Sequence, residues 1–177
     1  MKRSFLILLL TLVIITITGC GPTTQTGTLV LQITDQPNLN IEKALVTISS
    51  VQVHIAGEEE SNETNTTTEA GWFTVVDEAK TFDLIQIKDV KEFLGSAELQ
   101  NGRYTQIRLD VGEALVTIDG TDYDLTIPSK TVKLVRTFTI EPNQTTTLTL
   151  DFDAQESIRS AGKDKYVMRP TIKVIQE

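Results

Sequence analysis

Cysteine and histidine are almost absent from this 177-residue chain, which has one of each, Cys20 and His54. A single cysteine excludes an intramolecular disulfide, and a single histidine leaves few ligands for a zinc site. Nucleophilic hydrolases need a nucleophile, a base and an orienting group within reach of one another. His54 alternates with Val53 and Ile55 in a strand-like pattern, so we expect it to face solvent rather than to act as a base.

Runs of basic residues are also absent, and aromatic residues are few. The chain has 16 Lys and Arg against 24 Asp and Glu, and its formal net charge at pH 7 is −8. Nucleic acids are bound by clustered Lys and Arg, so this balance argues against a nucleic-acid partner. Only 6% of the residues are aromatic. One residue of the adjacent pair Trp72 and Phe73 must face the core of a strand-built fold, and we predict Trp72 to be a packing residue rather than a sugar platform.

The long hydrophobic run of the chain lies at its amino terminus. Lys2 and Arg3 precede a thirteen-residue segment, 5–17, that is apolar apart from two threonines. A transmembrane helix needs about 20 apolar residues, so this run is too short to span a membrane comfortably and is typical of a secretory signal. Ile17-Thr18-Gly19-Cys20 resembles a lipobox, in which the cysteine accepts the lipid.

We therefore expect residues 1–19 to be a lipoprotein signal peptide, Cys20 to be lipidated, and residues 20–27 to be a tether. The protein would then be anchored at the extracytoplasmic face of the cell membrane, because a diacylglycerol group holds a protein more firmly than one acyl chain does. Lipidation also explains why an exported chain carries one unpaired cysteine. Two alternatives remain open, an ordinary secretory signal and a short uncleaved anchor.

Threonine is abundant, with 27 residues, and it alternates with valine, leucine and isoleucine in short runs. This pattern is typical of half-buried strands and predicts an all-β fold, an antiparallel β-sandwich that forms a single domain over residues 28–177. One or two short helices are expected near Asp89–Gly95 and Asp153–Gly162. The acidic, Thr-rich segment 57–71 is predicted to be a mobile loop. Strands are predicted over residues 28–34, 44–55 with a bulge near Ser49-Ser50, 72–76, 81–87, 104–118, 121–127 after an Asp119-Gly120 turn, 131–140, 145–152 and 166–175.

Several short segments, in a fixed order along the chain, carry a family resemblance. They are Thr34-Asp35-Gln36-Pro37, Gly71-Trp72-Phe73, Phe82-Asp83-Leu84-Ile85, residues 102–109, Ile127-Pro128-Ser129, Leu150-Asp151-Phe152-Asp153, Ser157-Ile158 and residues 166–172. Together these segments resemble the family known as domain of unknown function 4382, which occurs in exported and lipid-anchored proteins. The resemblance runs from about Gly27 to Val174 and implies a prealbumin-like (transthyretin-like) β-sandwich without an established activity. An immunoglobulin-like sandwich fits the strand pattern as well.

Carboxylates are the remaining candidates for chemistry. Asp151 and Asp153 are two apart on a predicted strand and should point outward, as should Asp110 on its own strand. Oxygen ligands of this kind can hold calcium, so these three aspartates are weak calcium candidates. Cross-strand ion pairs with outward-facing basic residues are the simpler explanation. Paired carboxylates could also serve a glycosidase, but we predict no catalytic residue, metal or cofactor.

Three asparagines, Asn62, Asn65 and Asn143, begin Asn-x-Thr sequons and are candidate glycosylation sites. With these features, the sequence predicts a lipid-anchored binding or structural module of the cell envelope that is not an enzyme. Its expected partners are the membrane, through Cys20, and an envelope protein or glycan. The alternatives are a calcium- or ligand-binding module like an adhesin and an enzyme that acts on envelope glycans.

Overall fold

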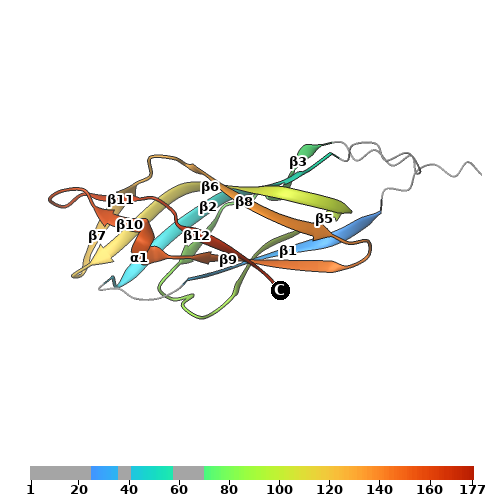
Figure 1. Ribbon diagram of the computed structural model, residues 1–177. Coiled ribbons are helices and arrows are strands. Elements are labelled where there is room, and N and C mark those ends of the chain that lie inside the picture. Colours follow the sequence, from blue (N-terminus) through green and yellow to red (C-terminus); the bar gives the residue numbers. More distant parts are fainter. Residues whose placement is uncertain (1–24, 36–40, 58–69) are drawn as a thin grey trace, which may run out of the picture.

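The computed structural model describes residues 25–35, 41–57 and 70–177 (Figure 1). The predicted signal peptide, Cys20 and the first part of the tether lie outside the described residues. Most of the segment 57–71, including Asn62 and Asn65, lies outside them as well. The described part consists of strands and one short helix: β1 (Thr26–Asp35), β2 (Lys43–Ile55), β3 (Gly71–Val76), β4 (Lys80–Asp83), β5 (Glu92–Gln100), β6 (Gly102–Ile118), β7 (Thr121–Thr126), β8 (Thr131–Ile140), β9 (Thr145–Phe152), α1 (Ala154–Ser157), β10 (Ile158–Ser160), β11 (Tyr166–Met168) and β12 (Ile172–Gln176).

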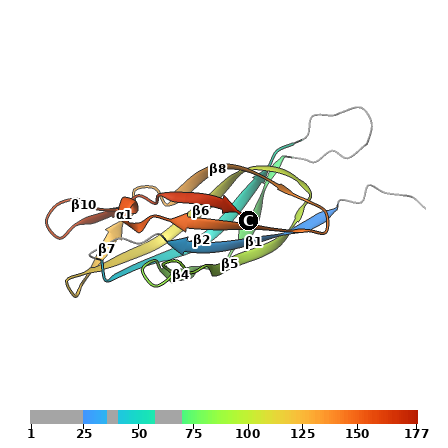
Figure 2. The ribbon, with the colours of Figure 1, turned by 60° about the horizontal axis from the view of Figure 1, so that its bottom comes forward.

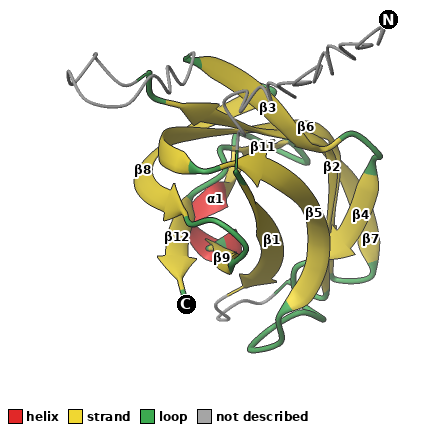
Figure 3. Ribbon diagram, turned by 90° about the vertical axis from the view of Figure 1, so that its right-hand side faces the viewer, coloured by secondary structure: helices red, strands yellow, loops and turns green. Residues whose placement is uncertain are grey.

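The strands form two sheets that face each other, so the predicted all-β sandwich is confirmed (Figure 3). The smaller sheet has four strands in the order β12-β9-β1-β5. The larger sheet has eight strands, with the path β10-β11-β7-β6-β2-β3 and with β4 and β8 paired to β2 and β6. Strand β6 runs the length of the larger sheet and changes partner along the way, from β8 at Gly102–Asp110 to β7 at Leu115–Ile118.

The sandwich is not antiparallel throughout as predicted, because two strand pairs are parallel. β1 runs parallel to β9, and β11 runs parallel to β7. Tight turns impose antiparallel pairing only on neighbours in the sequence, whereas both parallel pairs join strands that are far apart along the chain. Hydrophobic alternation reports which face of a strand is buried and carries no information on the direction of its partner.

The helix predicted near Asp89 is also wrong. Asp89 has a φ of 56°, a left-handed conformation that does not begin a helix, and the residues that follow form β5 at the edge of the smaller sheet. Leu94 and Leu99 are buried in this strand, whereas Phe93 is 56% exposed with the ammonium group of Lys80 5.0 Å from its ring centroid. A capping pattern followed by three apolar residues fits one helical turn as well as an irregular strand, and pairing with β1 decides between them.

Most other predicted elements are present with shifted bounds, but the strand predicted over residues 81–87 ends at Asp83, and residues 84–87 form a turn. The second short helix is α1, with Asp153 as its N-cap. The hairpin turn at Asp119-Gly120 has a positive φ at both residues, and the register of β2 shifts on either side of Ile48 near the predicted bulge. The strand predicted over residues 166–175 is divided into β11 and β12, which belong to different sheets. Pro170, which has no N–H group to donate, lies where the chain crosses between them.

The core lies between the sheets and is built from the buried face of each alternating strand. Leu29, Leu31 and Ile33 of β1 and Val46 and Ile48 of β2 are fully buried. Tyr104 is the largest fully buried side chain. Its ring stacks on Phe138 with centroids 5.2 Å apart, and its hydroxyl donates a hydrogen bond to the carbonyl oxygen of Gln100 at 3.0 Å, so the phenol's donor is satisfied.

The first described residues of the chain lie at one end of the long axis of the sandwich. Gln25 and Thr26 accept backbone hydrogen bonds from Asn101 and Asn143, each at 2.8 Å. Ala56, which precedes the segment 58–69, donates to the carbonyl oxygen of Arg103 at 2.8 Å. We call this the proximal end. The turn between β10 and β11 lies at the opposite, distal end, beside the turn between β6 and β7 (Figures 1 and 2).

The buried phenol predicts a distinctive alkaline titration. Burial raises the pKa of Tyr104 from 10.0 to about 12. Because the folded state holds this proton more tightly than the unfolded state, the stabilisation is present below pH 10 and is lost as the pH rises from 10 towards 12. Spectrophotometric titration should show a tyrosine phase near pH 12 that Tyr104→Phe removes and Tyr123→Phe leaves in place. Ionisation of Tyr104 near pH 10 in the folded protein would contradict this.

Candidate functional site

The three candidate calcium ligands are not brought together. Asp110 lies on β6 of the larger sheet, where it accepts a hydrogen bond from the Thr131 hydroxyl at 2.7 Å. Asp151 lies on β9 of the smaller sheet, and Asp153 accepts a 2.9 Å hydrogen bond from the backbone N–H of Glu156 as the cap of α1. Among the described residues there is no group of three or more His, Cys, Asp or Glu side chains that could hold a metal ion.

Asp151 alternates with Leu150 and Phe152 on β9, as expected for a residue of the outer face, but it is only 5% exposed. β9 is an inner strand between β1 and β12, and Thr34 and Lys173 are its register partners on either side of Asp151. Neighbouring strands on both sides cover a short side chain even on the outer face of a sheet. Alternation therefore gave the correct face but not the exposure.

His54 lies on the outer face of the larger sheet, as predicted, but Trp72 does not face the core. Phe73 packs against the core instead, and Trp72 lies on the outer face with its ring centroid 4.9 Å from that of His54. The guanidinium carbon of Arg108 is 3.8 Å from the Trp72 ring centroid. Either residue of the Trp72-Phe73 pair could have faced inward, and the phase set by pairing with β2 decides which one does.

Asn143 is the one predicted glycosylation site within the described residues. It is exposed and lies in the turn between β8 and β9 at the proximal end. Its φ of 56° is a left-handed conformation that asparagine tolerates better than most residues, so the turn alone explains its presence. The backbone N–H of Gln144 closes this turn on the carbonyl oxygen of Glu141 at 3.3 Å.

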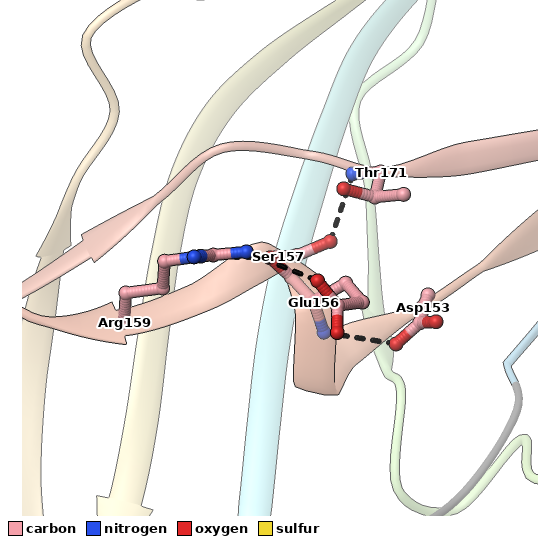
Figure 4. A network of polar contacts seen from close by, with 5 residues as sticks. All are labelled: Asp153, Glu156, Ser157, Arg159 and Thr171. Carbon is pink, nitrogen blue, oxygen red and sulfur yellow. Dashed lines mark hydrogen bonds and ion pairs between the residues drawn. The ribbon is translucent and has the colours of Figure 1, made fainter.

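Polar contacts hold α1 in place, and we call those of Asp35 and Ser157 the polar frame. Figure 4 shows the contact of Ser157 with Thr171 beside those of Asp153, Glu156 and Arg159. Asp35, at the end of β1, is 2% exposed and its carboxylate accepts a 3.0 Å hydrogen bond from the backbone N–H of Ala154. The hydroxyl of Ser157, which is fully buried, accepts from the N–H of Thr171 at 2.9 Å. The frame therefore ties the end of β1, the helix and the crossover before β12 together. Sequence analysis did not assign these roles, although Thr34-Asp35 and Ser157 belong to the family-like segments.

Beside this frame is a groove of about 530 Å³ on the ladder of β10 and β11. Arg159 and Arg169 line it together with Glu156, Ser160, Ala161, Val167 and Thr171. Arg159 donates to the carboxylate of Glu156 at 3.0 Å and to its carbonyl oxygen at 3.4 Å. Within the described part of the chain, the Arg169 side chain makes no hydrogen bond or ion pair. The groove thus presents one oriented and one unengaged guanidinium group.

Positive charge gathers around this groove although the chain as a whole is acidic. The segment 158–173 holds five basic residues and a single acidic one, Asp164. This concentration is not evident from the sequence, because the basic residues are spaced apart and form no run. Counting charge over a window of two short strands and their turn would have found it. The basic residues are Arg159, Lys163, Lys165, Arg169 and Lys173.

A second groove, of about 640 Å³, lies where β6 changes partner from β8 to β7. Its lining combines apolar side chains such as Leu45, Leu115 and Ile127 with the charged residues Glu113, Asp124 and Lys130. The lining contains no aromatic ring.

In the described part of the chain, no helix is long and apolar enough to cross a membrane.

The polar frame predicts that Asp35 is important for stability although it is remote from solvent. Asp35→Ala leaves the N–H of Ala154 buried without its acceptor, so the free energy of unfolding should fall by about 1–3 kcal/mol. Urea denaturation measures this change. Asp124→Ala removes an exposed carboxylate on β7 and is the matched control, for which we expect little effect. Equal stability of the two variants would show that the frame does not hold α1 in place.

Comparison with known proteins identifies the family but no activity. A comparison with curated proteins found no match. The chain is similar to a crystal structure from Bacteroides ovatus ATCC 8483 that is described provisionally as a cell adhesion protein, with 9% sequence identity and a TM-score of 0.26. That match covers 85% of this chain and 44% of the other, so the chain spans less than half the length of the solved protein. The family model described as Domain of unknown function (DUF4382) matches residues 26–170. As the sequence resemblance predicts, the protein belongs to the DUF4382 family.

Proposed function

We propose that the protein is a lipid-anchored module of the cell envelope that binds or supports a partner and performs no catalysis. The observation that carries this proposal is the position of the proximal end. Gln25, the first described residue, follows the candidate lipidated Cys20 by five residues, a length of chain that reaches at most about 18 Å. A lipid on Cys20 would therefore keep the proximal end close to the membrane and direct the distal end away from it.

The contacts of the polar residues support a non-catalytic role. Several described residues with the chemistry of acids and bases have structural partners and lie on different elements. His54 lies against Trp72 and within 3.5 Å of the Thr105 hydroxyl, Asp35 and Asp153 hold the start of α1, and Asp110 binds Thr131. A general acid or base must instead reach a substrate proton at hydrogen-bond distance.

The two alternative functions have less support from the geometry. A calcium-binding module needs six to eight oxygen ligands around one point, and the three aspartates named for it lie on or beside strands of different sheets. An enzyme acting on envelope glycans would need two carboxylates on either side of a bound sugar. Glu113 and Asp124 share the groove beside β6, but its lining offers no aromatic ring for a sugar to stack on.

The anchor is tested by changing its one candidate attachment atom. Cys20→Ser removes the thiol that would accept the lipid, so the protein should move from the membrane pellet to the soluble fraction after ultracentrifugation. Incorporation of a labelled fatty acid should be lost at the same time. Thr23→Ser, three residues away in the tether, is the matched control and should stay in the pellet with its label. Retention of Cys20→Ser in the pellet would rule out lipidation as the anchor.

A further inference from the structure

We propose that the groove between Arg159 and Arg169 at the distal half of the sandwich binds the carboxylates of an acidic polypeptide segment on a partner protein. This inference deepens the proposed function by naming the chemistry of the partner. The inference rests on the proposed function only for the direction in which the groove faces. A lipid at the proximal end would leave the groove facing away from the membrane. Binding itself depends on the groove alone.

The register of β10 and β11 places the two arginines on one face of the ladder. Arg159 is directly opposite Val167, and Arg169 follows Val167 by two residues on the same face. Diagonal neighbours of this kind lie roughly 7–8 Å apart at their Cα atoms, which is within the reach of two long side chains towards one ligand. Val167 shares this face and adds an apolar side chain to the lining of the groove.

The backbone that carries the arginines is held firmly. The N–H of Arg169 donates to the carbonyl oxygen of Ser157 at 2.8 Å, and the N–H of Thr171 donates to its hydroxyl at 2.9 Å. Met168 and Ser157 are fully buried beneath the groove. Because the frame around α1 fixes this backbone, a ligand would lose little affinity to ordering the site.

The two guanidinium groups differ in whether they already have an ion-pair partner. Glu156 orients Arg159 through an exposed ion pair, which contributes little to stability but limits where the remaining N–H donors of Arg159 point. Arg169 has no such partner within the described residues. A guanidinium group binds a carboxylate through two parallel N–H···O bonds, so Arg169 is the natural primary contact and Arg159 a second one beside it.

The surrounding charge favours a ligand with several carboxylates. Lys163 and Lys165 are exposed in the turn next to the groove, and Asp164 is the one acidic residue in the segment 158–173. In a protein of net charge −8, this local excess of positive charge is a place to which an acidic partner can be steered. Its acidic border is β7, which pairs with β11 and carries Asp122 and Asp124.

The lining favours a polypeptide over an anionic glycan. Side chains along the groove are aliphatic or carry hydroxyl groups, with Ser160, Ala161, Val167 and Thr171 as examples, and none is aromatic. β10 is also the terminal strand of the larger sheet. An extended acidic peptide could run along this edge and add backbone hydrogen bonds to the carboxylate contacts, as peptides do when they add a strand to a sheet.

The test measures binding of fluorescein-labelled poly-L-glutamate to the full chain in neutral detergent at low ionic strength, by fluorescence anisotropy. We expect Arg169→Gln and Arg159→Gln each to weaken binding about tenfold, and Arg169→Lys, which keeps the charge but not the fork, to weaken it by a smaller factor. Arg136→Gln, an exposed arginine on β8 outside the groove, is the matched control with unchanged affinity. Thermal melting confirms that each variant is folded.

Three results would overturn the proposal. Poly-L-glutamate that does not bind the unmodified chain would show that the groove is not a carboxylate site. An equal loss with Arg136→Gln would show general charge attraction. Tighter binding of polygalacturonate than of poly-L-glutamate would assign the groove to a glycan. None of these results depends on the lipid, so failure of the groove and failure of the Cys20 anchor are distinguishable.

Discussion

The parallel pairing of β1 with β9 is the constraint on which the rest of the structure depends. It joins Thr28–Asp35 to Thr145–Phe152 and makes β1 an inner strand of the smaller sheet, with β5 on its other side. The last residue of β1 then supplies the buried carboxylate at the start of α1. Without this pairing, neither the helix nor the crossover from β11 to β12 would have a fixed position. A contact between segments so far apart in the chain also makes folding slow relative to hairpin formation.

The two ends of the molecule differ in the segments and side chains that they carry. The proximal end holds the start of β1, the turn with Asn143 and both flanks of a Glu- and Thr-rich segment. The distal half holds the basic hairpin of β10 and β11 and its groove. The distal end is not uniformly basic, because the β6–β7 turn and β7 carry Asp119, Asp122 and Asp124. In the proposed anchored form, a lipid on Cys20 would hold the proximal end at the membrane and leave the arginine groove facing away from it.

The pattern of residue types along the chain predicted the features that depend on residues close together in the sequence. Alternation identified the buried faces of β1, β2, β6 and β9, and the Asp119-Gly120 turn and the Asp153 cap were recognised from residue types that suit those conformations. What could not be predicted depends on pairing between distant segments. The strand β5 in place of a helix, the parallel pairs, the inward face of Phe73 and the burial of Asp151 all follow from neighbours that are remote in the sequence. The arginine groove is a different case, because β10 and β11 are consecutive strands and its basic residues are close in the sequence without forming a run.

The path of β1 also has a mechanical consequence. If Cys20 carries the lipid as proposed, the anchor acts on the first residues of an inner strand, and a partner held at the distal hairpin would pull from the other end of the same long axis (Figure 2). Such a pull acts along the strands, so the hydrogen bonds of β1 to β5 and β9 would be loaded together in shear instead of being opened one after another. In that case the sandwich would transmit tension between the membrane and the partner as a stiff rod. Its resistance to unfolding under this tension would come mainly from β1.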